Sequence, residues 1–250
     1  MRKVDSPWHD VRLRQAVNYA INRDDLIRYA TKGNGVIVPA LLAVDAFGYD
    51  PDLAPYPFDP DKARHLLREA GYPDGVSVSL IAPGVLEVQA TVVSKMLEQS
   101  GFTVDLRVLD AVTFNQQTVL SDLDQPPEHQ LWDIALTSWS DLLNFPVFQV
   151  YHNFVFDGRH DWVREQPALR QLREQVLRTV DQETQQALIR QLERHASEQA
   201  YFLFLYNPIQ LYAVNKAVNF VPYVNVLTLT ETSVTAQHWS VRKQKAAVPE

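Results

Sequence analysis

The chain has 250 residues, a formal net charge of −7 and no cysteine. That length suffices for one large domain or two small ones. The scattered acidic residues leave no basic stripe for phosphate groups, which argues against nucleic acid as a partner. The lack of cysteine excludes disulfides, thiolate nucleophiles and cysteine-ligated zinc. No stretch reaches the roughly 20 apolar residues that span a bilayer, and MRKVDSPWHD contains no signal-peptide core.

Two core-facing helices are expected at the start of the chain. The apolar spacing predicts the first over Asp10–Ile21, and Asn22 begins a second that runs to about Lys32. From Gly33 to Pro57 the composition becomes typical of a loop. Ordered loops of this length are uncommon and often functional, although a packed surface loop is an equal alternative.

The stretch from Pro57 to Gly75, PFDPDKARHLLREAGYPDG, predicts a capped helix. Asp59 is a natural N-cap, and Pro60 fits the first turn, where no amide donor is needed. Gly71 ends the helix in a left-handed conformation. Helices with such caps are common, so this pattern alone predicts only structure.

A strand, helix, strand order follows, which is typical of a parallel crossover. The strands are expected at VSVSLIAP (76–83), with Val76, Val78 and Leu80 on one face, and at FTVDLRVL (102–109), with a helix over Leu86–Ser100 between them. A helix over Asp110–Leu120 and a third strand, LWDIALTSW (131–139), come next. The order predicts an α/β layer.

The last third is expected to begin with two helices, Glu165–Val180 and Glu183–Ala200. Their inward residues are Leu169, Leu172, Val176, Leu188, Ile189 and Leu192. The segments YFLFLYNP and IQLYAVN are predicted as strands, the segment NVLTLTETSV as β-like, and Lys243–Glu250 as a frayed end.

Four segments, in this order, resemble the large extracytoplasmic solute-binding proteins of family 5, the dipeptide- and oligopeptide-binding type. They are WHDVRLRQAVNYAINRDDLI, GYDPDLAPYPFDPDKARHLLREAGYPDG, WDIALTSWSDLLNFPVF and YFLFLYNPIQLYAVN. The resemblance implies a type II periplasmic-binding-protein-like fold, in which two α/β lobes close on a solute. Residues 1–200 correspond to the second lobe, with a mixed, mainly parallel sheet flanked by helices. Residues 201–250 correspond to a β-rich return segment of the first lobe, the rest of which is absent.

That resemblance further implies the solute-binding component of an ABC importer, which binds a peptide, an oligosaccharide or a similar solute without chemistry and without a cofactor or metal. Its expected partners are the permease subunits and the missing N-terminal lobe, and its expected location is the periplasm or another extracytoplasmic space. An uncovered apolar face would favour self-association through Phe202, Phe204, Tyr206 and Tyr212.

The candidate site lies where the third predicted strand ends, since open α/β sheets usually hold ligands at the carboxyl ends of their strands. Trp139 offers a flat apolar face for stacking, and Ser138, Ser140, Asp141 and Asn144 could orient polar groups of the ligand. Trp139 could instead be a core residue, and Asp141 could be an N-cap.

Relatives that bind peptides commonly place an acidic residue three positions after this tryptophan, to pair with a peptide's amino terminus. This chain has Leu142 there, and no arginine precedes Trp139 in its strand to receive a carboxylate. The solute class therefore remains open.

Two other functions stay as alternatives. A metal-dependent hydrolase is suggested by YHNFVFDGRHDW, which holds His152, Asp157, His160 and Asp161, although this spacing matches no standard motif and a solvated loop explains it better. No GxSxG, P-loop or Rossmann pattern is present. The other alternative is a ligand-sensing module of a regulator. Against it, the sequence has no helix-turn-helix and no basic segment before Trp8.

Overall fold

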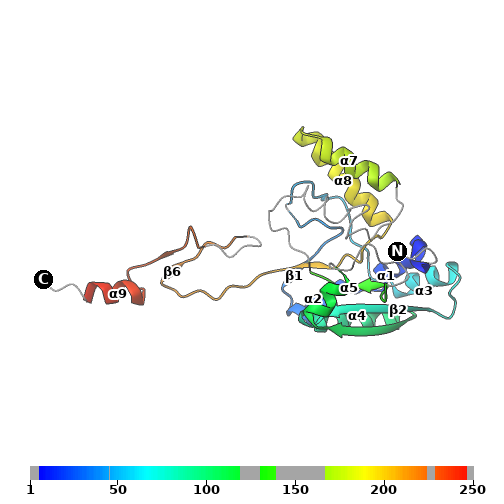
Figure 1. Cartoon of the computed structure of the whole chain (residues 1–250), viewed down its shortest axis with the longest axis horizontal. Coiled ribbons are helices and arrows are strands. Elements are labelled where there is room, and N and C mark those ends of the chain that lie inside the picture. The colour runs from blue at the N-terminus through cyan, green and yellow to red at the C-terminus, as the bar shows by residue number, and fades with distance from the viewer. Residues whose placement is uncertain (1–5, 45, 119–129, 139–166, 224–228, 247–250) are drawn as a thin grey trace. The chain divides into compact units, whose positions relative to one another are not determined.

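The computed structural model describes residues 6–44, 46–118, 130–138, 167–223 and 229–246. These residues divide into two compact units, one up to Ile209 and one from Gln210 on. The predicted domain boundary at residue 200 stays a prediction. Figure 1 shows the elements in order along the chain.

In the first unit the helices are η1 (Pro7–His9), α1 (Val11–Tyr19), α2 (Arg23–Thr31), α3 (Pro60–Glu69), η2 (Gly84–Leu86), α4 (Glu87–Gln99), α5 (Ala111–Gln117), α7 (Pro167–Arg178) and α8 (Gln182–Glu198). Its strands are β1 (Gly35–Ile37), β2 (Val76–Pro83), β3 (Phe102–Leu109), β4 (Ile134–Ala135) and β5 (Tyr206–Pro208). The second unit holds β6 (Val218–Asn219), β7 (Ser233–Val234) and α9 (Trp239–Ala246).

The main sheet is parallel, with the strand order β3-β2-β4, which confirms that the three predicted segments share one sheet. Val76 lies opposite Phe102, and the pairing continues along the whole of β2. The third strand is shorter than predicted. At the start of β4, the carboxylate of Asp133 accepts the N–H of Ser79 where a backbone carbonyl could accept it.

Helices cover both faces of this sheet. Val76, Val78 and Leu80 share a face, as predicted, and pack into a core with α1, α3 and α4. Ile81 points to the other face and packs against Phe114 of α5 and against Trp132. The sequence of a strand buried on both faces is typically a nearly continuous apolar run, as in the second half of β2.

Helix α3 and its connection into β2 follow the predicted capping pattern. The carboxylate of Asp59 accepts the N–H of Lys62 at 2.8 Å, and Gly71 adopts a φ of 94°. Gly75 is required by space as well as by its positive φ. A Cβ at that position would lie 2.3 Å from the carbonyl oxygen of Gly101.

A second core lies between α7, α8 and the segment before α3. The predicted inward residues Leu169, Val176, Ile189 and Leu192 are buried there, with Leu172 and Leu188 partly buried. Figure 1 shows α7 and α8 packed side by side. The helix ends lie within about two residues of the predicted ones, which is the usual uncertainty of such boundaries.

Several predictions for strands and ends were wrong. The expected loop from Gly33 contains β1, because β5 supplies it with an antiparallel partner from far along the chain. YFLFLYNP is a strand only at Tyr206–Pro208, and IQLYAVN forms no strand with any described residue. Within NVLTLTETSV the described strand is Ser233–Val234. The supposedly frayed end begins inside α9, whose Lys, Gln and Ala residues favour a helix.

Buried arginines connect the N-terminal helices to the segment that leads into β5. The guanidinium of Arg23 donates to the carbonyl oxygens of Phe204, Ile21, Tyr56 and Asn18 and to the side-chain oxygen of Asn18, at 2.7 to 3.2 Å. Burial lowers the pKa of Arg23 to about 10. It therefore stays protonated at neutral pH and keeps all these donors.

Arg14 repeats this arrangement one helix earlier. It donates to the carbonyl oxygens of Gln199, Trp8 and His9, and its guanidinium lies over the ring of Tyr201 at 5.5 Å. Burial is the main cause that lowers the pKa of Arg14. Both arginines thus satisfy carbonyl groups that would otherwise be buried without a donor.

We expect Arg23→Met to lower the free energy of unfolding by about 3 kcal/mol or more, because it leaves several buried carbonyl groups unpaired. Arg28→Met on the same helix is the control. Arg28 is exposed and pairs with Asp25, so its loss should cost less than about 1 kcal/mol. Urea denaturation measures both values, and equal losses would contradict the role assigned to Arg23.

Candidate functional site

The carboxyl edge of the parallel sheet is the candidate site. β2 is the central strand and ends at Pro83, β3 ends at Leu109, and β4 ends at Ala135. The chain then continues into η2, α5 and the segment at Ser138, respectively. Ligands of open α/β sheets usually bind outside this edge.

Ser138 is the predicted site residue that the structure describes, and it is exposed beyond the end of β4 together with Thr137. The other four, Trp139, Ser140, Asp141 and Asn144, lie outside the described residues, so their roles remain predictions. His152, Asp157, His160 and Asp161, of the alternative metal site, also lie outside them. Among the side chains that are described, no group of three or more potential metal ligands occurs.

Three exposed valines at this edge were missed by the sequence analysis. Val85 follows β2 and is 87% exposed, Val88 opens α4 and is 55% exposed, and Val112 opens α5 and is 66% exposed. Each lies at a strand-to-helix junction, outside the buried stripe of its helix, and that position was the available signal. The β2 and β3 side of the edge is therefore apolar, whereas the β4 side carries hydroxyl groups.

Asp110 adds a negative charge at the end of β3, and that charge is already engaged. Its carboxylate accepts the N–H groups of Val112 and Thr113, both at 3.0 Å, and the hydroxyl of Thr113 at 2.6 Å. The hydroxyl bond from Thr113 is the largest of the causes that lower the pKa of Asp110. This carboxylate therefore caps α5 and is held as an anion.

β4 is held in place by polar contacts with its neighbours. Asp133 binds the N–H of Ser79 at 2.8 Å, and the N–H of Leu136 donates to the carbonyl of Ile81 at 2.8 Å. From β3, Arg107 reaches across to the carbonyl oxygen of Leu131. These contacts determine where Ser138 emerges from the edge.

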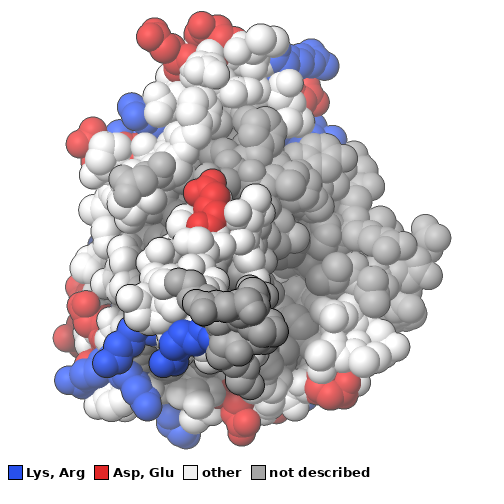
Figure 2. All heavy atoms as spheres, turned by 90° about the vertical axis from the view of Figure 1, so that its left-hand side faces the viewer, with Lys and Arg blue, Asp and Glu red and all other residues white. Residues whose placement is uncertain are grey.

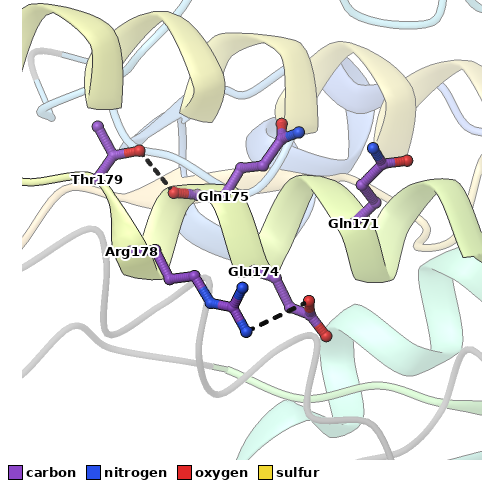
Figure 3. Close-up of a pocket in the computed structure, with 5 residues that line it drawn as sticks. All are labelled: Gln171, Glu174, Gln175, Arg178 and Thr179. Atoms are coloured by element: carbon purple, nitrogen blue, oxygen red, sulfur yellow. Dashed lines mark hydrogen bonds and ion pairs between the residues drawn. The ribbon is translucent and has the colours of Figure 1, made fainter.

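A separate depression of about 360 Å³ lies on α7 and is lined by Gln171, Glu174, Gln175, Arg178 and Thr179. Figure 3 shows that its polar side chains interact within the helix itself, with Arg178 beside Glu174 at 4.0 Å. The hydroxyl of Thr179 donates to the carbonyl of Gln175 at 2.7 Å. These groups follow one another on a single helix surface and do not converge on a point, so we do not assign a site there.

The described surface carries both signs of charge. Figure 2 shows one face, on which Lys and Arg side chains stand in small groups near Asp and Glu. None of the described helices is long and apolar enough to cross a membrane.

The model for the bacterial extracellular solute-binding proteins, family 5 Middle, matches residues 2–160. The chain belongs to this family. Its members, and the structural neighbours described below, are binding proteins and not enzymes.

Curated relatives include the glutathione-binding protein GsiB of Salmonella typhimurium strain LT2. It is 42% identical over 85 residues, which cover 32% of this chain and 15% of the relative. The GsiB protein of Escherichia coli strain K12 is 40% identical over the same length and coverage. The match thus spans well under two thirds of these relatives.

Solved structures show the same fold. The periplasmic binding protein DppA of Helicobacter pylori, in complex with the peptide STSA, has a TM-score of 0.71 at 21% identity and covers 83% of this chain and 40% of its own. HbpA2 of Haemophilus parasuis has a TM-score of 0.75 at 18% identity and covers 91% and 45%. The predicted type II periplasmic-binding-protein-like fold, with its mainly parallel sheet, is confirmed.

We expect Asp133→Ala to destabilise the protein by about 1.5 to 3 kcal/mol, the scale of a hydrogen bond to a charged group, and to expose the amide of Leu136 to hydrogen exchange. Asp74→Ala, in the turn before β2, is the control, because that residue is exposed. Amide exchange by NMR measures the effect. Unchanged protection of Leu136 in Asp133→Ala would show that the carboxylate does not position β4.

Proposed function

We propose that this chain is part of the solute-binding component of an ABC importer and binds its solute, without chemistry, at the carboxyl edge of the β3-β2-β4 sheet. The observation that carries the proposal is the exposed Ser138, directly before Trp139, at the end of a parallel strand in a chain of this family. Trp139 would stack on the solute, and Ser138, Ser140, Asp141 and Asn144 would orient it.

A peptide or a similar small solute is the class that the relatives favour. GsiB is named a glutathione-binding protein, and the AppA protein of Bacillus subtilis was solved with a nonapeptide. Leu142 cannot neutralise an ammonium group, and an unpaired charge in a closed cleft is costly. The solute therefore need not carry a free amino terminus. The apolar side of the edge, at Val85 and Val112, would face an apolar part of the solute.

The proposed partners are the permease subunits of the importer and a first lobe that supplies the opposite wall of the cleft. In this arrangement residues 1–200 form the second lobe and residues 201–250 return to the first. The proposed location is the periplasm or another extracytoplasmic space, which agrees with the description of the family as extracellular.

In a two-lobe protein that contains this chain, Trp139→Ala should weaken solute binding by about 1 to 3 kcal/mol, the scale of a lost buried aromatic contact. Titration calorimetry with a short peptide and its N-acetylated form measures both the affinity and the need for a free amino terminus. Trp239→Ala, at an exposed tryptophan of α9, is the matched control.

The chain of 250 residues alone should bind weakly, because one lobe encloses only one side of a ligand. An unchanged dissociation constant in Trp139→Ala would contradict the stacking role. Strong selection for the free over the acetylated peptide would contradict the proposal about the amino terminus, and tight binding by the chain alone would contradict the two-walled site.

We also propose that the chain alone self-associates, but mainly through other residues than those the sequence suggested. Phe204 is buried against α8, and Phe202 and Tyr206 are partly buried within the first unit, so these three are not the uncovered aromatics that the sequence suggested. Tyr212 is exposed in an extended segment, Gln210–Val214, that also exposes Leu211 and Val214.

Exposed apolar residues in an extended segment are a typical surface for strand pairing between chains. Sedimentation velocity should therefore show a concentration-dependent dimer that Leu211→Lys weakens. Val180→Lys is the control, since Val180 is 92% exposed but lies in the short connection between α7 and α8. A strictly monomeric chain at high concentration would refute self-association.

A further inference from the structure

Glu193 is a buried carboxylate that no part of the proposed site uses. It lies on α8 at 3% exposure, on a helix whose Ile189 and Leu192 belong to the second core. Its Oε2 atom accepts the backbone N–H of Leu42 at 3.0 Å, and the backbone N–H of Leu41 donates to the same carboxyl group. An acidic side chain of α8 thus binds the loop that follows β1.

The same loop is attached to α8 at a second carboxylate, which comes from the loop itself. Asp50 is buried and pairs with Arg194, the residue after Glu193. Between these two points Gly48 packs directly on Ile189, where a Cβ would come within 2.4 Å of that side chain. Leu42, Gly48 and Asp50 therefore all contact α8.

The two carboxylates differ in their surroundings. Asp50 has a cation beside it, and the bond from Arg194 is the largest cause that lowers its pKa, with Arg190 contributing. Glu193 accepts backbone N–H groups and lies within reach of the negative charge of Asp50. Burial is the largest cause that raises the pKa of Glu193, to about 7. The N–H bonds from Leu42 and Leu41 oppose this rise, and Asp50 adds to it.

We propose that Glu193 and Asp50 form a two-carboxylate clasp between α8 and the 41–50 loop. Protonation of Glu193 strengthens its contact with the loop, whereas the contact at Asp50 does not depend on protonation. Below about pH 7 Glu193 carries the proton while the loop is docked, because ionising a carboxylate is costly in this core. When the loop leaves α8, the side chain reaches water and ionises. The clasp does not depend on the proposed solute-binding function.

The sign of the pH dependence follows from this assignment. The docked state binds the proton more tightly than the undocked state, whose pKa is that of an ordinary glutamate. Docking is therefore strongest below about pH 4.5 and weakens by up to about tenfold per pH unit as the pH rises toward 7. Above pH 7 both states are ionised and docking changes no further.

The loop connects this equilibrium to the chain near the end of the first unit. It follows β1, which pairs with β5, and β5 ends one residue before Ile209. Asn34, just before β1, accepts the N–H of Ile209 at 3.1 Å. The loop is thus joined through β1 to the strand pair at which the first unit ends.

The test is hydrogen exchange of the full chain between pH 5.5 and 8, followed by mass spectrometry and corrected for the intrinsic exchange rate. Peptides that cover residues 41–50 should lose about tenfold in protection between pH 5.5 and 7 and then level off. Glu193→Gln should abolish this dependence, because a glutamine keeps an acceptor for Leu42 but does not titrate. Glu183→Gln, on the exposed first turn of α8, is the matched control and should behave as the unmodified chain.

The same pH dependence in Glu193→Gln as in the unmodified chain would overturn the proposal, and so would protection that does not change with pH. Should Glu193→Gln fail to fold, the carboxyl ¹³C resonance of Glu193 in the unmodified chain decides the matter. A titration midpoint near 7 supports the clasp, and a midpoint near the ordinary value of about 4.3 overturns it.

Discussion

The structure of the first unit depends on buried guanidinium groups that donate to backbone carbonyl groups. Arg14 and Arg23 bind the carbonyl oxygens of Gln199 and Phe204, and Asn18 between them binds that of Phe202. A buried charge is tolerated only when its donors are satisfied, so these bonds allow little freedom in where the segment after α8 can lie. That segment belongs to both cores. Phe204 packs with α8, and Leu205 and Tyr206 pack against the core that β2 forms with α1, α3 and α4. The arginines therefore hold the two cores together and place β5 beside β1.

The candidate site depends on this arrangement only indirectly, through the sheet that the first core supports. Because β2 is central and buried on both faces, its carboxyl end and those of β3 and β4 meet at one edge. Hydroxyl groups at Thr137 and Ser138 stand on the β4 side, and exposed valines on the β2 and β3 side. An edge with both characters suits a solute that has apolar and polar parts.

Local patterns in the sequence predicted the elements whose formation depends on near neighbours. The cap at Asp59, the glycine at position 71 and the alternation in β2 each involve residues a few positions apart, and each was confirmed. The third strand was predicted too long. At its start the side chain of Asp133, and not a backbone carbonyl, accepts the N–H of Ser79, 54 residues away in the chain. The exposed valines were missed because apolar residues are expected inside, although their position at strand-to-helix junctions was a signal that these three are not.

The sequence by itself thus determined the main helices of the first unit, the two long strands of the parallel sheet and the family, since periodicity, capping residues and motifs are read directly along the chain. Only the tertiary structure decided that β1 exists, since its partner β5 lies about 170 residues further along the chain. It also decided that Arg23 and Glu193 are buried, through contacts with Phe204 and Leu42 that are 181 and 151 residues away in the chain. Charged side chains are usually exposed, and no local pattern distinguishes the few that are not. Their burial follows from where distant backbone groups come to lie, which the folded chain alone determines.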